Sequence, residues 1–191
     1  MSPILESIGS VKGFGWGKIL SSTAFESIAT ATVGAGGAAD ITFSSIPSTF
    51  THLQIRFNMR TPGYGGSFMQ INGDTGNNYS YHYLGRAGAS TVVAGGDANG
   101  PYIFMGNTGQ AQSNLILSHI IDILDYKNAN KIKGVKILSG LEAQPTGTAA
   151  WIGLLSGAWQ NTSAITSIKL YMSGGSFGQY TKAALYGIRG A

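Results

Sequence analysis

The sequence predicts an all-β protein, an antiparallel and jelly-roll-like β-sandwich that follows a short N-terminal arm. In the segment Thr51–Arg60, polar side chains alternate with the apolar residues Leu53, Ile55, Phe57 and Met59. Because successive side chains of a strand point to opposite faces, this strand has an apolar face that a second layer must cover. About ten strand-sized segments occur at the spacing typical of sandwiches, without a convincing long helix. The order of the strands stays open.

The composition favours a subunit of an assembly over a freely diffusing monomer. The chain has 191 residues, which suits one domain with or without an arm, and 43% of them are hydrophobic. Only 10% are charged, against roughly 25% in ordinary globular proteins, and 29 residues are glycine. A polar surface with few charges can be buried against neighbours without stripping many ions of water.

Charge, cysteine content and hydropathy disfavour several classes of function. The net charge is +4, but the basic residues cluster only around Lys127–Lys136, so we expect no nucleic-acid-binding face. The absence of cysteine excludes disulfides, cysteine-based zinc sites and thiol nucleophiles. No apolar run approaches the roughly 18 residues of a membrane span, and the first residues do not resemble a secretion signal. We therefore expect no membrane insertion.

The N-terminal segment Met1–Ser22 differs from the rest of the chain. Its glycines interrupt any periodic pattern and surround the large aromatic residues Phe14 and Trp16. We interpret it as an arm that contacts a partner through Phe14, Trp16 and Lys18, with the sandwich domain spanning residues 23–191. The alternative is that both aromatic side chains pack back onto their own domain, since such side chains are usually buried.

Glycine and proline separate the first predicted strands. Phe25–Val33 and Asp40–Ile46 flank the segment GAGGAA, which is a strand–turn–strand pattern. Pro47 ends the second of these strands, and the strand Thr51–Arg60 follows. The segment PGYGG then breaks the chain before a strand at Ser67–Asn72.

The middle of the chain reads as a long loop followed by short strands. We expect Gly73–Gly85 to be a polar and aromatic loop that can hold one turn of helix. Thr91–Ala94 and Tyr102–Met105 are predicted to be short strands around a further glycine turn.

The segment Leu115–Tyr126 is ambiguous between helix and strand. Leu117, Ile120, Ile121 and Leu124 have the spacing of one helix face. Four isoleucines in the segment favour a strand, because β-branched side chains pack well on a sheet. We predict a strand.

The remaining chain is predicted to form a hairpin and three further strands. Lys127–Lys131 is a turn that leads back into a strand at Ile132–Leu141. The last three strands are expected at Ala150–Trp159, Ile165–Met172 and Ala183–Ile188.

Four segments resemble a recurrent domain of tailed-bacteriophage structural proteins. They are ITFSSIPSTFTHLQIRFNMRT, INGDTGNNYSYHYL, IIDILDYKNANKIKGVK and WQNTSAITSIKLYMSGGSFGQYTKAALYGIRG. The resemblance runs from about Ile41 to Gly190 and consists of similar strands and turns. It implies a virion subunit, usually oligomeric, that serves as capsid decoration or cement, head fibre or tail component. The family brings no catalytic residues.

The resemblance also implies how such a subunit would be attached. The short arm is similar to phage proteins that insert an N-terminal segment into the particle and display a β domain outward. We therefore expect a non-enzymatic virion protein, assembled in the host cytoplasm, with major capsid or tail proteins as partners. We also expect it to form a homo-oligomer, with a trimer favoured. Location on the head or the tail stays open.

A group of aromatic residues offers an alternative function. Tyr79, Tyr81 and Tyr83 alternate, with His82 among them, and would share one face if the segment were extended. Aromatic rings stack on sugars and bases, so these residues can form a glycan-contacting surface for receptor recognition. The structural alternative is that the tyrosines cap one end of the sandwich.

No catalytic, metal or cofactor site is predicted. Asp122 and Asp125 are the only closely spaced carboxylates in an apolar setting, but on a strand they would lie on opposite faces. The three histidines, His52, His82 and His119, are far apart in the sequence, whereas a metal site needs several ligands together.

Two polar segments have both a structural and a functional interpretation. The segment Asn72–Asn78 is rich in side-chain oxygen atoms of the kind that bind calcium. It lacks the ligand spacing of an EF-hand, so we favour a turn. Lys127, Lys131, Lys133 and Lys136 surround the predicted hairpin, where lysines at strand edges discourage unwanted pairing. The alternative is a basic tip that meets an acidic capsid shell or glycan.

Overall fold

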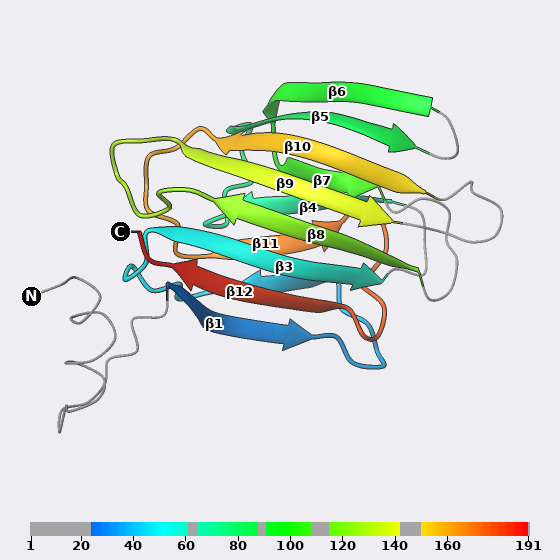
Figure 1. Cartoon of the computed structure of the whole chain (residues 1–191), viewed down its shortest axis with the longest axis horizontal. Coiled ribbons are helices and arrows are strands. Elements are labelled where there is room, and N and C mark those ends of the chain that lie inside the picture. The colour runs from blue at the N-terminus through cyan, green and yellow to red at the C-terminus, as the bar shows by residue number, and fades with distance from the viewer. Residues whose placement is uncertain (1–23, 61–64, 88–90, 108–114, 142–149, 191) are drawn as a thin grey trace, which may run out of the picture.

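The structure, a computed structural model, describes residues 24–60, 65–87, 91–107, 115–141 and 150–190. These residues form twelve strands and no helix. The strands make two antiparallel sheets that pack against each other (Figure 1). The predicted all-β sandwich is therefore confirmed.

Apart from β5, which was not predicted, and β6, which is longer than predicted, the strands lie close to the predicted segments. Their bounds are β1 (Phe25–Thr32), β2 (Asp40–Phe43), β3 (His52–Arg60), β4 (Gly66–Ile71), β5 (Tyr79–Ala87), β6 (Thr91–Gly100), β7 (Ile103–Asn107), β8 (Ile116–Ile123), β9 (Lys133–Leu141), β10 (Trp151–Trp159), β11 (Ile168–Met172) and β12 (Lys182–Ile188).

The strand order is that of a jelly roll with additions to one sheet. The small sheet has the order β2-β11-β4-β7, and the large sheet has the order β1-β12-β3-β8-β9-β10-β5-β6. From β2 to β7 and again from β10 to β11, the chain passes between the sheets in the sequence of a jelly roll. The hairpin β8–β9 is inserted between β3 and β10, and β12 and β1 extend the large sheet beyond β3.

Strand β3 has the two-sided character that its sequence predicts. Leu53, Ile55, Phe57 and Met59 are fully buried between the sheets, while the side chains between them face outward. The strand is hydrogen-bonded to β12 on one side and β8 on the other. Its apolar face therefore forms part of the core under the large sheet.

The ambiguous segment is a strand, as predicted. Strand β8 pairs with β3 over its whole length and with β9 from Ser118 to Ile123, so the expected hairpin is also confirmed. Its burial alternates, with Leu117, Ile121 and Ile123 inside and Ile116 and Ser118 outside. Every second side chain of β8 is buried, which is the pattern of a strand. In a helix, the buried side chains would recur every three or four residues.

The prediction of a loop through Gly85 is wrong. Strand β5 begins at Tyr79, and its pairing with β10 runs without interruption from Tyr79 to Ala87. The predicted glycine turn after Ala94 is also wrong, because Gly95 and Gly96 lie within β6 opposite Tyr83 and His82. Glycine marks close packing beside these rings, which sequence reasoning mistook for a turn.

Candidate functional site

The candidate site is an aromatic cleft where the two sheets part. The small sheet ends at β7, whereas the large sheet continues past β10 through β5 to β6 (Figure 1). The cleft has a volume of about 440 Å³. Its lining, called the aromatic cleft from here on, comprises Gly65, Gly66, Phe68, Tyr81, Tyr83, Tyr102, Phe104, Asn107 and Ser173.

Rings from both sheets meet in the aromatic cleft. Tyr81 and Tyr83 of β5 face Phe104 of β7, with ring centroids 5.7 and 5.4 Å from the Phe104 centroid. Tyr102 lies nearly parallel to Tyr81 at 6.4 Å and contacts Phe68 of β4 at 4.2 Å. These contacts arrange the rings around a concave surface formed by β4, β5, β7 and Tyr102, the residue before β7.

Two glycines keep space for these rings. A Cβ atom at Gly66 would lie 2.7 Å from the ring of Phe68. A Cβ atom at Gly95 of β6 would lie 2.7 Å from the hydroxyl of Tyr83. Since real Cβ atoms do not approach so closely, a side chain at either position would displace the ring.

The polar groups of the aromatic cleft are uncharged. The hydroxyls of Tyr81, Tyr83 and Tyr102 form no hydrogen bond with any residue that the structure describes. Ser173 Oγ accepts a hydrogen bond from the main-chain N–H of Gly66 at 3.2 Å. Burial, with a smaller effect of Tyr102, raises the pKa of Tyr81, so its phenol stays neutral at physiological pH. The cleft can therefore bind through ring faces and neutral hydroxyls.

Tyr79 does not belong to this site, so its prediction as a glycan contact is wrong. The side chain is fully buried, and its hydroxyl accepts a hydrogen bond from Ile71 N at 2.9 Å and donates to Asp74 O at 2.9 Å. Burial raises the pKa of Tyr79 to about 12. At this end of β5 the turn after β4 covers the ring, so Tyr79 serves the core.

His82, also predicted as a glycan contact, lies apart from the aromatic cleft. It lies between Tyr81 and Tyr83 on β5, so its side chain points to the exposed outer face of the large sheet. Of the four residues predicted to contact a glycan, only Tyr81 and Tyr83 line the aromatic cleft.

Sequence reasoning missed the half of the cleft that the small sheet supplies. Phe68 and Phe104 are cross-strand partners on β4 and β7, and Tyr102 immediately precedes β7. The alternation of Tyr102 and Phe104 was the one local signal. That this pair faces Tyr81 follows only from the packing of the sheets.

A second feature is an aliphatic row on the outer face of the large sheet. Leu84, Leu154, Leu138 and Ile120 are successive cross-strand partners on β5, β10, β9 and β8. The first three are at least half exposed. Ile152 (56% exposed) and Val92 (73%) lie diagonally beside the row. We call these six residues the outer apolar face.

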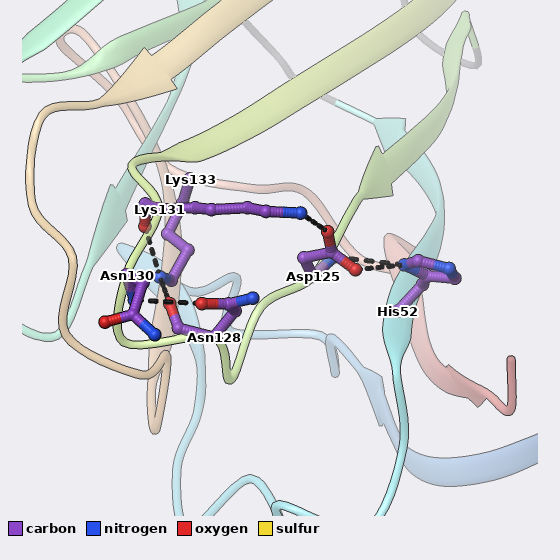
Figure 2. Close-up of polar contacts among 6 residues, drawn as sticks. All are labelled: His52, Asp125, Asn128, Asn130, Lys131 and Lys133. Atoms are coloured by element: carbon purple, nitrogen blue, oxygen red, sulfur yellow. Dashed lines mark hydrogen bonds and ion pairs between the residues drawn. The ribbon is translucent and has the colours of Figure 1, made fainter.

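The turn between β8 and β9 uses its lysines internally, as Figure 2 shows. Lys131 forms an ion pair with Asp125 at 2.8 Å, and Asp125 also lies 3.7 Å from His52. Lys133 is fully buried and donates to the main-chain oxygens of Asn128, Lys131 and Thr162. A hollow of about 480 Å³ lies on this turn, and the charged groups that line it, Asp125 and Lys127, already have partners within the chain.

The carboxylates and histidines considered for chemistry lie apart. Asp122 accepts a hydrogen bond from Gln54 Nε2 at 2.7 Å on the outer face of β8, whereas Asp125 lies in the following turn. His119 is buried on the inner face of β8, and His52 accepts a hydrogen bond from Asp125 N at 3.0 Å. Among the described residues, no group of three potential ligands could hold a metal ion.

The loop Asn72–Asn78 is a turn whose oxygen atoms bind within the chain. Asp74 accepts hydrogen bonds from Gly76 N at 2.9 Å and from Trp159 Nε1 at 2.8 Å. The hydrogen bond from Trp159 is the main cause of the lowered pKa of Asp74. Asn72 Oδ1 accepts from the main chain of Thr166 and Ser167. These bonds close one end of the sandwich.

Phe14, Trp16 and Lys18 lie outside the described residues, so their predicted partner contacts remain predictions. Within the described residues there is no helix with the length and apolar character needed to cross a membrane. Comparison with protein-family models and with curated proteins finds no match for this chain. Its function is therefore argued from the fold, the aromatic cleft and the outer apolar face.

Proposed function

We propose that this protein is a non-enzymatic structural subunit of a phage virion that assembles with copies of itself. It attaches to the particle through Met1–Ser22 and displays the β-sandwich, as capsid decoration or as a head-fibre or tail adaptor. The outer apolar face is the observation that supports assembly most directly. The resemblance to phage structural proteins supports the setting in a virion.

The outer apolar face is unfavourable in water. Its central row crosses four adjacent strands, which are about 4.8 Å apart, so it is about 14 Å long. Burial of apolar surface contributes roughly 25 cal/mol per Å², and monomeric proteins rarely expose large contiguous apolar patches. Such a row suits the centre of an interface that buries about 800 Å² per partner.

A second copy of this chain is the partner that the outer apolar face fits best. An aliphatic surface is complementary to an identical aliphatic surface, and closed homo-oligomers are the commonest assemblies. Beside the row, Arg56 Nε donates to Gln54, and Gln54 donates to Asp122, so these polar groups are satisfied within one chain. Arg86 lies on the same face between Ile152 and Val92, so the apolar contact is centred on the row itself. Contact of this face with itself closes a dimer, whereas the trimer favoured from the sequence would place this face against a different surface of the next copy.

The test is the oligomeric state of Leu154→Glu, measured by size-exclusion chromatography with light scattering. Leu154 is 63% exposed at the middle of the row, so a charge there would be buried in the assembly. We expect the wild-type protein to be oligomeric at micromolar concentration and Leu154→Glu to be monomeric and folded.

Ile132→Glu is the matched control. Ile132 is 56% exposed but lies in the turn before β9, outside the outer apolar face. We expect this variant to retain the wild-type mass. A monomeric wild-type protein, or an oligomer that survives Leu154→Glu, would refute assembly through this face.

A further inference from the structure

The aromatic cleft combines features that a core cluster does not need. Core rings are covered on all sides, whereas Tyr81, Tyr83 and Tyr102 are only partly buried around an open space of about 440 Å³. Ligand pockets have volumes of roughly 300–1,000 Å³ and combine aromatic walls with a few polar groups. The cleft falls at the lower end of that range.

Four side chains of the aromatic cleft carry polar groups that can meet a ligand. The three tyrosine hydroxyls and the Asn107 side chain form no hydrogen bond with any described residue. The hydroxyl of Tyr79, four residues before Tyr83 on the same strand, is fully satisfied by main-chain atoms. One strand thus carries a tyrosine used for folding and two whose hydroxyls face an open cleft.

The charges exclude several ligand classes. The residues that line the aromatic cleft include no aspartate, glutamate, histidine, lysine or arginine. A phosphate, sulfate or carboxylate group would be held without a cation, which is unfavourable. The best match is a neutral molecule with an apolar face and many hydroxyls, because aromatic rings cover C–H faces while tyrosine and asparagine bind hydroxyls.

We propose that the aromatic cleft is a binding site for a neutral saccharide, in which Tyr81 stacks on a sugar ring above a floor formed by the buried Phe104, and Tyr83, Tyr102 and Asn107 bind its hydroxyls. The site accommodates about one or two sugar rings. It goes beyond the proposed assembly and is independent of it, because the cleft lies between the sheets and the outer apolar face lies on the other side of the large sheet.

A proline-rich peptide is the competing ligand, since aromatic-lined grooves also bind polyproline helices. In such grooves the aromatic rings lie in a row along the extended peptide ligand. Here the rings of Tyr81 and Tyr83 are tilted by 43° and 58° against Phe104 and form a bowl, which fits a compact ring better.

The experiment uses the full chain on an array of neutral and anionic glycans, followed by calorimetric titration. The titrants are maltohexaose, cellohexaose, mannohexaose, chitohexaose, oligogalacturonate and a decaproline peptide. We expect at least one neutral oligosaccharide to bind with a Kd on the order of 1 mM or tighter. Stacking lost in Tyr81→Ala should weaken that binding at least tenfold.

A second variant separates binding from folding. In the triple variant Tyr81→Phe, Tyr83→Phe and Tyr102→Phe, all rings remain and no hydrogen bond to a described residue is lost. We expect an unchanged thermal midpoint and about tenfold weaker saccharide binding. Tyr186→Phe, on β12 at the far end of the large sheet, should change neither quantity.

Three results would overturn the proposal. The first is that no neutral glycan binds on the array or in titration. The second is that saccharide binding survives both cleft variants at wild-type strength. The third is that decaproline or oligogalacturonate binds more tightly than every neutral oligosaccharide.

Discussion

Three tyrosines on one strand show how far a single residue's role depends on its surroundings. Tyr79, Tyr81 and Tyr83 occupy equivalent inward positions on β5. The turn after β4 covers the first, which becomes fully buried with all its polar capacity used. The other two face Phe104 of β7 across the open aromatic cleft and remain only partly buried. Identical chemistry and spacing therefore lead to a core residue and to two cleft residues.

His119 is the residue whose titration should matter most for stability. It is buried against Phe57, with ring centroids 5.2 Å apart, and its Nδ1 atom has no hydrogen-bond partner among the described residues. Its Nε2 atom lies 3.4 Å from Ser67 Oγ. Burial lowers the pKa of His119 to about 4, from 6.5 in an exposed histidine. The folded protein thus holds this ring neutral.

We predict an acid-induced loss of stability that depends on His119. Between pH 6.5 and about pH 4, His119 binds a proton in the unfolded chain but not in the folded protein. The free energy of unfolding is therefore highest above pH 6.5 and decreases as the pH falls to about 4. The loss is about 3 kcal/mol, because each pKa unit corresponds to about 1.4 kcal/mol. Urea unfolding at pH 7.5 and 4.5, at one fixed protein concentration, measures it.

The variant His119→Phe keeps the ring but removes the proton site. Its stability should fall less between the two pH values than that of the wild type, by about 2–3 kcal/mol. His82→Gln, at an exposed position, should behave like the wild type. An equal fall in His119→Phe and wild type would show that other groups cause the acid sensitivity.

At the scale of elements, Lys133 holds two connections of the large sheet together. Its ammonium group donates to Asn128 and Lys131 in the turn before β9 and to Thr162 in the connection between β10 and β11. Sequence reasoning grouped this lysine with the exposed ones around the hairpin. The structure corrects this, because three carbonyl oxygens replace water around a fully buried ammonium group.

We predict that Lys133→Met destabilises the fold by about 2 kcal/mol. Methionine fills similar space but leaves three main-chain oxygens without their charged donor. Lys182→Met, at an exposed position on β12, should change the free energy of unfolding by less than about 0.5 kcal/mol. Chemical denaturation of both variants at pH 7 measures the difference. Equal stability of the two would mean that the turn holds without Lys133.

At the scale of the whole molecule, a low charge content and an exposed aliphatic row lead to the same expectation. Only 10% of the residues are charged, and the outer apolar face lies across five strands of the large sheet, β8, β9, β10, β5 and β6. Both features reduce the cost of covering the surface with another copy. Assembly through one sheet face leaves the aromatic cleft, between the sheets, accessible to a ligand.

We predict that deletion of Met1–Ser22 separates attachment from folding. Every described strand lies between Phe25 and Ile188, so the shortened chain retains both sheets. Its thermal midpoint should stay within about 2 °C of the wild type. Quantitative gel analysis of purified particles should show that the shortened protein is absent from them. Unchanged occupancy would refute attachment through the arm.

Replacement of Phe14, Trp16 and Lys18 by alanine tests the proposed contact more finely. If these three residues carry the attachment, the full-length variant should be lost from particles as completely as the deletion. Occupancy equal to that of the wild type would assign attachment to another part of the chain.

The sequence by itself determined the fold class, most strand positions and the burial of β3. These follow from alternation along one strand, which each segment carries in its own side chains. It also determined that the surface is poor in charge. The loop prediction for Gly73–Gly85 failed because asparagine and glycine mark both turns and close packing.

Only the tertiary structure decided the jelly-roll order, the aromatic cleft and the outer apolar face. Phe68 and Phe104 meet Tyr81 because β4, β7 and β5 come together from distant parts of the chain. The aliphatic row likewise exists only in the pairing register of four strands. Strand pairing joins segments that are far apart in the sequence and depends on how whole sheet faces pack. No single segment therefore determines its own partner.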